Sequence, residues 1–367
     1  MRPNTGSWLR GDDMKVLFLT THVAGERKPS TDAASQTIID DMSRLGADVT
    51  RLSQERDGTN RRSSTFGRQI RDFLRSAQFD VVIIHHAALG WVTEILPNHV
   101  RVVALVHGIE HEVHQRSSHS SRPWSQWLCR KQARLLQRLE SQLAQRADEI
   151  WTFTPHDAAF FARLSGGRRT RVMTPSGLAN PSIATISKTH DVALLSDWTS
   201  PSNIDGLQWF LTQVYPKLPP DITIRIGGKG ADCLVGRYRN VAYQSFVGNT
   251  HKFLAEARVA AILTISDVGM HADTLTALSA GSRIVATPCA LRGLSALPSD
   301  VVAAGDPDTF AKQLAAAIRA PDDGGVRIEA MRWTSERKHR HSMELAAGLR
   351  IAPPAPSTQP AELTATA

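Results

Sequence analysis

The chain has 367 residues, of which 41% are hydrophobic and 21% are charged. Because a single core stops growing at roughly 250 to 300 residues, this length predicts two domains. The composition is typical of a globular chain and excludes fibrous or wholly disordered proteins. The net charge of +8 permits anionic partners such as phosphates or lipid surfaces, but it does not choose among them.

No apolar run approaches the roughly 18 residues that a membrane-spanning helix needs. The opening sequence MRPNTGSWLRGDD has no apolar segment of the kind that a secretory signal carries. We therefore expect a cytoplasmic protein. The 3 cysteines lie far apart, which fits reduced thiols and excludes a four-cysteine zinc site.

Short apolar strands alternate with amphipathic helices, a rhythm that predicts parallel sheets covered by helices on both faces. In the first half of the chain the expected strands are residues 15–20, 48–52, 80–84, 102–106 and 150–153. A polar segment that contains Pro and Ser follows, and the rhythm then restarts. The second set of expected strands is residues 192–195, 222–226, 241–243, 259–263 and 283–286. Two similar α/β domains are predicted, at residues 14–175 and 190–325, and residues 351–367 are expected to form a disordered tail.

Four segments, in this order along the chain, resemble those of a known family. They are HGIEHEVHQR (107–116), ADEIWTFTPHDAAFF (147–161), LLSDWTSPSNIDGLQWF (194–210) and SDVGMHADTLTALSAGSRIVATPCALRGL (266–294). The family is bacterial glycosyltransferase family 4, a group of retaining enzymes. The resemblance implies the GT-B fold, in which an acceptor-side and a donor-binding Rossmann-like domain face each other across a cleft. It also implies a last helix, residues 326–350, that crosses back to the first domain.

The same resemblance implies an enzyme that moves a sugar from a nucleotide-sugar donor to a glycan or lipid-linked acceptor with retention. Such a hexosyltransferase would serve cell-surface polysaccharide biosynthesis, and it would require no metal and no cofactor. One alternative is a catalytically degenerate GT-B protein that binds a nucleotide sugar or glycan without transfer. A sugar-nucleotide epimerase is a third interpretation, although the sequence lacks recognisable acids and a diphosphate clamp for that reaction.

Donor binding is expected where a strand of the second domain leads into a helix, because free backbone N–H groups there can bind phosphate oxygens. The residues expected at this site are Gly269, Met270, His271, Asp273, Thr274 and Thr276. Gly228 and Lys229, in the run IGGKG, are expected to add a close backbone approach and a cation.

Two of these positions depart from the family pattern. The family usually carries a basic residue at the position of Asp273 and, at the position of Thr276, a glutamate that holds the donor ribose. If Asp273 is the helix N-cap and turns away from the ligand, His271 and Lys229 would supply the donors that face phosphate. If it faces the cleft instead, its charge would repel the diphosphate.

His107 ends an apolar strand, at the edge where ligands collect in open α/β sheets. It matches the family histidine near the sugar and is the expected catalytic residue. His107, His111 and His114, with Glu110, also raise the alternative of metal ligation. Because the later two histidines lie beyond Gly108 on a turn or helix, no common face is expected and no metal site is predicted.

The segment from Trp124 to Arg146 carries five cations against a single acid, Glu140, together with several leucines and tryptophans. One interpretation is a core helix with a solvated basic face. The other is a helix that lies on an anionic membrane, as would suit a lipid-linked acceptor at the inner face of the cell membrane. No nucleic-acid motif accompanies the basic residues, so a nucleic-acid partner is not expected.

Overall fold

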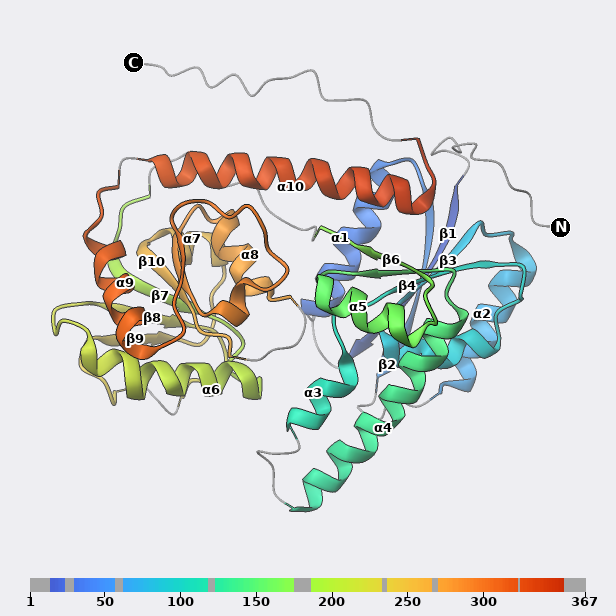
Figure 1. Cartoon of the computed structure of the whole chain (residues 1–367), viewed down its shortest axis with the longest axis horizontal. Coiled ribbons are helices and arrows are strands. Elements are labelled where there is room, and N and C mark those ends of the chain that lie inside the picture. Colours follow the sequence, from blue (N-terminus) through green and yellow to red (C-terminus); the bar gives the residue numbers. More distant parts are fainter. Residues whose placement is uncertain are drawn as a thin grey trace.

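The computed structural model has two α/β domains with a long C-terminal helix lying across both (Figure 1). The structure describes residues 14–23, 30–56, 62–117, 123–174, 186–232, 236–265, 270–322 and 324–352. Nearly all of the predicted tail lies outside these residues. In the described part of the chain, no helix has the length and apolar character needed to cross a bilayer.

The first domain is built on a parallel sheet, whose described strands number six and follow the order β2-β1-β3-β4-β5-β6. The strands are β1 (Lys15–Val23), β2 (Asp48–Arg56), β3 (Val81–His85), β4 (Arg101–Leu105), β5 (Glu149–Thr152) and β6 (Arg169–Val172). The helices are α1 (Ser30–Arg44), α2 (Ser64–Ser76), the 3-10 helix η2 (Ala87–Glu94), α3 (Glu110–Ser117), α4 (Pro123–Arg146) and α5 (Pro155–Leu164). Since all the strands are parallel, their carboxyl ends lie along one edge of the sheet.

The second domain repeats this plan, with a parallel sheet in the order β12-β11-β10-β7-β8-β9 over the residues described. Its strands are β7 (His190–Leu195), β8 (Ile224–Gly227), β9 (Val241–Gln244), β10 (Ala257–Ile262), β11 (Arg283–Ala286) and β12 (Val301–Ala303). Its helices are α6 (Pro201–Trp209), η3 (Phe210–Val214), η4 (Tyr215–Lys217), α7 (Thr250–Ala255), α8 (Ala272–Ser279), η6 (Pro288–Leu291) and α9 (Pro307–Arg319). The helix α10 (Gly325–Leu349) follows.

The predicted α/β class with two domains is confirmed, and each predicted strand has a counterpart within a few residues. The sequence analysis missed β6 and β12, which are the strands at one edge of each sheet. β6 reads RTRV and β12 has only three residues. Neither has the longer apolar run that marks a strand buried on both faces, which is why the pattern did not reveal them.

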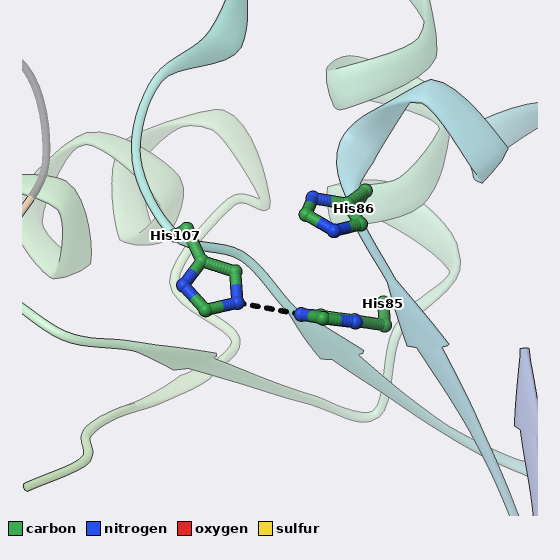
Figure 2. Close-up of side chains that lie close together, drawn as sticks. All are labelled: His85, His86 and His107. Carbon is green, nitrogen blue, oxygen red and sulfur yellow. Dashed lines mark hydrogen bonds between the residues drawn. The ribbon is translucent and has the colours of Figure 1, made fainter. Parts of the chain in front are cut away.

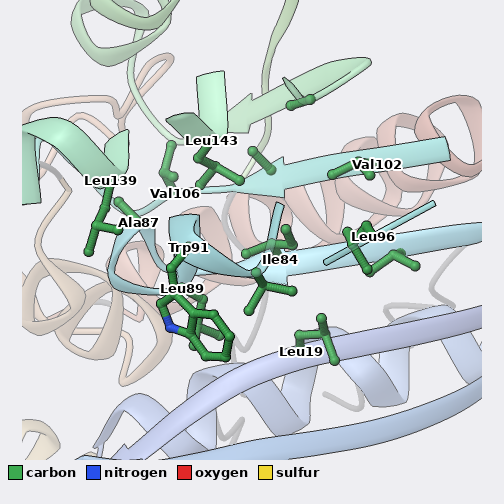
Figure 3. Packing of buried hydrophobic residues seen from close by; sticks show 14 of the residues in the cluster. Leu19, Ile84, Ala87, Leu89, Trp91, Leu96, Val102, Val106, Leu139 and Leu143 are labelled. Carbon is green, nitrogen blue, oxygen red and sulfur yellow. The ribbon is translucent and has the colours of Figure 1, made fainter. Parts of the chain in front are cut away.

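Each face of the first sheet has its own core, because successive residues of a strand point to opposite faces. Leu17 and Leu19 belong to the core beneath α2, η2 and α4, part of which Figure 3 shows. Val16 and Phe18 belong to the opposite core, which α1 and the end of α10 cover. The second domain likewise has one core beneath α6 and α9 and another beneath α7 and α8.

Helix α10 is bonded to both domains. Near its start, the carboxylate of Glu329 accepts hydrogen bonds from the backbone N–H and the hydroxyl of Ser299, both 3.0 Å long. Near its end, the carboxylate of Glu344 accepts hydrogen bonds from the backbone N–H and the hydroxyl of Thr174, at 2.5 and 3.1 Å. The helix therefore fastens the second domain to the first.

A glycine allows the end of α10 to approach the first sheet. Gly348 faces the ring of Trp151 on β5, and a Cβ atom added to the glycine would lie 2.4 Å from the ring atom Cζ2. The Trp151 side chain is fully buried and cannot move aside cheaply. Any larger residue at position 348 would push the helix away from β5.

We predict that Gly348→Ala destabilises the protein by about 1–3 kcal/mol, because the added methyl group overpacks a closed core. Urea unfolding measures the change. Gly67→Ala is the matched control: Gly67 is also a buried helical glycine, but its added Cβ would lie an ordinary 3.4 Å from Trp91. That variant should be neutral or gain up to about 1 kcal/mol from helix propensity. Equal behaviour of the two variants would contradict the packing argument.

Candidate functional site

Three histidine rings meet at the carboxyl edge of the first sheet (Figure 2). His85 is the last residue of β3, His86 follows it, and His107 lies just beyond β4. The parallel register pairs His85 with Leu105, so the two strand ends bring the rings together. The Nε2 atoms of His85 and His107 are 2.5 Å apart and share a hydrogen bond.

Side chains from two other elements hold His85 in place. Its Nδ1 atom lies 2.9 Å from the hydroxyl oxygen of Ser35 on α1 and 3.2 Å from that of Thr20 on β1. The His85 ring is fully buried. Burial, together with the neighbouring histidines, holds the pKa of His85 well below its usual value. His85 is therefore neutral at pH 7.

The predicted catalytic residue His107 is also neutral. Burial lowers its pKa to about 3, and the charge of Glu110 only partly opposes this. With both rings neutral, one proton lies between the two Nε2 atoms. Whichever ring donates it, Nε2 of His107 is occupied, and Nδ1 is the nitrogen left for a ligand.

An unusual backbone conformation carries His86. Its φ angle is 82°, in the left-handed region that non-glycine residues seldom adopt and that often marks functional sites. Glu110 supports the turn: its carboxylate accepts a 2.8 Å hydrogen bond from the N–H of Ala87 and lies 3.6 Å from Nδ1 of His86. The sequence analysis singled out neither His85 nor His86, although two adjacent histidines at the end of an apolar strand were a usable signal.

His111 has a different role from His107. Its Nδ1 atom is 2.5 Å from the carboxylate of Glu140, and its backbone N–H donates to the same carboxylate at 3.1 Å. The hydrogen bond to Glu140 raises the pKa of His111, although burial opposes it. The pair joins α3 to α4, so His111 is committed to that contact and does not join the histidine cluster at the sheet edge.

Phe153, just beyond β5, connects the histidine edge to the second domain. Its ring stacks on His107, with the ring centres 4.8 Å apart. The neighbour of Phe153 in the second domain is Gly293. This glycine follows η6 and adopts a φ of 74°. A Cβ atom on this glycine would lie 2.8 Å from the backbone oxygen of Phe153. The carboxyl edges of the two domains therefore meet beside His107.

The residues expected to bind the donor occupy several different environments. Gly269 lies outside the described residues. Met270 is partly buried and packs against cores of both domains. The hydroxyl of Thr274 is buried and donates to the backbone oxygen of Ala290 at 2.7 Å, and the hydroxyl of Thr276 donates to that of Ala272 at 3.0 Å. Thr274 is thus a core residue.

Asp273 is not the N-cap of α8. The cap position is His271, and the carboxylate of Asp273 instead accepts a 2.5 Å hydrogen bond from the hydroxyl of Ser196, just after β7. Burial raises the pKa of Asp273 to about 6, while the bond from Ser196 opposes the rise. The residue that follows β7 therefore holds this carboxylate, and a local capping pattern could not predict that contact.

The glycines of the IGGKG run allow two loops of the second domain to pack closely. Gly228 has a φ of 112°, and a Cβ atom there would lie 1.8 Å from the backbone oxygen of Ser196. The indole N–H of Trp198 donates to the backbone oxygen of Gly227 at 2.8 Å, and its backbone N–H donates to that of Lys229 at 2.9 Å. The Lys229 side chain is exposed. The glycines are thus explained by packing within the protein.

A cavity of about 690 Å³ lies near the carboxyl edge of the first sheet, at the ends of β1 and β2. Residues from β1, β2 and the start of α2 line it. Most of these side chains are polar, among them His22, Ser53, Arg62 and Gln69. The ring of His22 is held by a 2.8 Å hydrogen bond to the hydroxyl of Ser53.

The two halves of α4 have different environments. In the second half, Leu136 and Leu143 are fully buried against the first sheet. The first half extends with α3 beyond the rest of the domain (Figure 1) and exposes Trp127 to 61%. The core-helix interpretation therefore fits the second half, whereas the first half is an exposed basic and apolar surface. The side chain of Trp124 lies outside the described part.

Two family models match the chain. The model described as "Glycosyl transferase 4-like domain" matches residues 4–177, and the model described as "Glycosyl transferases group 1" matches residues 190–320. The chain belongs to the glycosyltransferases. No curated protein matches this glycosyltransferase.

Solved structures share its architecture at low sequence identity. Sucrose-phosphate synthase from Thermosynechococcus elongatus is 13% identical, with a TM-score of 0.66 over 92% of this chain and 97% of that one. HepE of Anabaena, in complex with UDP and glucose, is 15% identical, with a TM-score of 0.59 over the same shares. An alpha-glucosyltransferase in complex with UDP and DNA is 9% identical, with a TM-score of 0.55 over 89% of this chain and 95% of that one. These likenesses confirm the predicted GT-B fold of this glycosyltransferase.

The raised pKa of Asp273 predicts a pH-dependent effect on stability. Because the folded carboxyl binds its proton more tightly than the unfolded one, its stabilising contribution is present below pH 3.8 and is lost as the pH rises through about 6. We expect Asp273→Asn to match the wild type near pH 4 and to exceed it by about 1–3 kcal/mol near pH 7. Urea unfolding at both pH values tests this. Asp205→Asn, an exposed acid on α6, should show no such crossover.

Proposed function

We propose that the protein transfers a sugar from a nucleotide-sugar donor to a glycan or lipid-linked acceptor, with retention. The observation that carries the proposal is the contact between Phe153 and Gly293, beside which His107 lies. This contact brings the histidine edge of the first sheet against the domain that matches the group 1 glycosyltransferase model. A sugar held between the domains would then contact His107.

His107 would act as a neutral hydrogen-bonding group. A pKa of about 3 leaves no positive charge on the ring at pH 7, so it cannot act as an imidazolium acid. Its Nδ1 atom would bond a hydroxyl of the transferred sugar, and the ring's stacking on Phe153 would fix its direction. His85 would position His107 through the bond between their Nε2 atoms.

The donor diphosphate would bind at the start of α8. Backbone N–H groups there, with His271 as the cap residue, would face the phosphate oxygens, and the exposed Lys229 would add a cation. Two of the structural relatives were solved in complex with UDP, and one of them also with glucose. A uridine diphosphate sugar is therefore the first donor to test.

In the proposed reaction, the bond between the sugar C1 atom and the diphosphate oxygen breaks, and C1 bonds to the acceptor oxygen on the same face. The acceptor hydroxyl gives its proton to the departing diphosphate, so charge and atoms balance. The protein mainly has to stabilise the negative charge on the departing diphosphate. The backbone N–H groups at the start of α8 and the side chain of Lys229 would provide this stabilisation.

The polar cavity at the carboxyl edge of the first sheet would accept the second substrate. Hydroxyl, amide and guanidinium groups line it, and these suit the many hydroxyl groups of a glycan. It lies in the domain matched by the 4-like model, near the edge that carries His107. A glycan end held there would point its hydroxyl toward the sugar between the domains.

The exposed start of α4 would bring the enzyme to a membrane that carries a lipid-linked acceptor. Trp127 and Leu128 are exposed, and Lys131 lies over the Trp127 ring at 5.2 Å. Exposed cations follow on the same helix, at Arg130, Arg134 and Arg138. An apolar tip flanked by cations suits an anionic lipid surface at the inner face of the cell membrane.

One observation favours a second candidate, a degenerate protein that binds a nucleotide sugar or glycan without transfer. Asp273 lies in the first turn of α8, where a carboxylate would repel a diphosphate. Its pKa of about 6 leaves it mostly ionised at pH 7. The hydrogen bond from Ser196 reduces the repulsion by holding the carboxylate, so transfer remains the preferred function.

Calorimetric titration with a panel of UDP and GDP sugars, followed by measurement of nucleoside diphosphate release, tests the function. We expect one donor to bind and to turn over. His107→Ala should lower turnover by about 100-fold without weakening donor binding, because the lost bond acts mainly as the sugar departs. Binding without turnover would support the degenerate alternative.

His99→Ala is the control for this variant. His99 is an exposed residue of the same domain just before β4, so it lies at the amino edge of the sheet, opposite the edge that carries His107. Its turnover should equal that of the wild type. If both variants lose turnover equally, His107 has no special role in transfer.

Co-sedimentation with phosphatidylglycerol vesicles tests the membrane contact. We expect Trp127→Ala to lower binding about tenfold or more, since burying a large apolar side chain contributes about 1.5–3 kcal/mol. Phe246→Ala removes a comparably large exposed side chain, 77% accessible, from the second domain. That control should bind as the wild type does, and an equal loss in both variants would exclude a specific role for α4.

A further inference from the structure

The histidine cluster has the composition of a metal site. Each of the three rings offers one ligand nitrogen, and these nitrogens all lie within 4.8 Å of one another (Figure 2). The alternative weighed from the sequence combined His107 with His111, His114 and Glu110, but His111 is bonded to Glu140 instead. Two of the three clustered rings, His85 and His86, were in no predicted site.

One nitrogen of the cluster has no hydrogen-bond partner among the residues that the structure describes. It is Nε2 of His86, a buried atom of a residue that is only 9% exposed. A buried polar atom without a partner costs about 1–3 kcal/mol, and native structures generally avoid it. The facing Nε2 atoms of His85 and His107, by contrast, satisfy each other with a single proton. A ligand at the centre of the cluster would satisfy all three.

Two of the three outer nitrogens lie near oxygen atoms, as the second nitrogen of a metal-bound histidine usually does. Ligating rings donate their second N–H to a hydroxyl, carboxylate or carbonyl, which fixes the tautomer. Nδ1 of His85 faces the hydroxyls of Ser35 and Thr20. Nδ1 of His86 lies 3.6 Å from the carboxylate of Glu110. For both rings, Nε2 is then the ligand atom.

We propose that His85, His86 and His107 bind a divalent transition-metal ion of the Zn²⁺ class through their Nε2 atoms. Three imidazoles suit such an ion and leave a fourth tetrahedral position open for water or a substrate oxygen. At Zn–N distances of about 2.0–2.1 Å, the ligand nitrogens lie about 3.3 Å apart. The His85–His107 pair must therefore open from 2.5 Å and the longest separation must close from 4.8 Å. Both changes would require rotation of the side chains.

Binding needs no net loss of protons. The proton now shared by His85 and His107 moves to an Nδ1 atom, so that each ring is neutral and protonated on Nδ1 when the ion binds. His85 then donates from Nδ1 to the hydroxyl of Ser35 or Thr20. The unusual φ of His86 belongs to the conformation that brings its ring to the cluster.

The test is titration of the full chain, without an affinity tag and stripped of metal, with Zn²⁺ by calorimetry. Visible spectra of the Co²⁺ adduct provide a second readout. We expect one ion per chain with a micromolar Kd and a tetrahedral Co²⁺ spectrum, whereas Mg²⁺, which prefers oxygen ligands, should not bind. Weaker than millimolar binding of Zn²⁺ would overturn the proposal.

Single variants identify the ligands. His86→Gln and His107→Gln should each weaken Zn²⁺ binding by at least tenfold, whereas the controls His156→Gln and His339→Gln, both in exposed positions, should not. If the controls weaken binding as much as the cluster variants do, Zn²⁺ is binding to scattered surface histidines and the proposal fails. Circular dichroism checks that each variant is folded. If one of the two cluster variants does not fold, the Zn²⁺ affinity of the other variant still tests the proposal.

The binding readout is independent of the proposed transferase activity. Metal binding without donor turnover would leave this proposal intact and count against the transfer reaction. Donor turnover in a chain that binds no Zn²⁺ would support the transfer reaction and overturn the proposed metal site. The two hypotheses therefore fail by different results.

Discussion

The packing of β5 is the constraint on which the arrangement of the two domains depends. Trp151 and Phe153 are two residues apart and belong to the same core, on one face of the first sheet. Trp151 receives the end of α10 through Gly348, and Phe153 receives the second domain through Gly293. Phe153 also stacks on His107. The short strand β5 and the residue after it thus fix the long helix, the domain contact and the histidine that we place in the site.

Much of the fold could be predicted from local patterns, whereas the site could not. Strands such as β3 are fully buried and read as continuous apolar runs, and His107 follows from the rule that ligands collect at carboxyl edges. The meeting of His85 with His107 depends on the register of β3 against β4, which one sequence does not reveal. The bond between Ser196 and Asp273 likewise joins residues 77 positions apart, so a local capping pattern gave the wrong partner.

The two sides of the site differ in their electrostatics. The first domain presents the uncharged imidazoles of His85 and His107, because burial lowers the pKa of both rings. The second domain presents a helix start and a carboxylate with a pKa of about 6. The positive charge of the whole chain is therefore not concentrated on the histidines. In the proposed reaction, backbone N–H groups at the start of α8 and the side chain of Lys229 would stabilise the leaving diphosphate.

Helix α10 also limits how the domains can move. It has 25 residues, and at 1.5 Å per residue it is a rod about 37 Å long. Glu329 and Trp333 fasten its start to one domain, and Glu344 and Leu345 fasten its end to the other. A rod held at both ends keeps its two attachment points a fixed distance apart. Any change in the space between the domains therefore has to leave the distance between these attachment points unchanged.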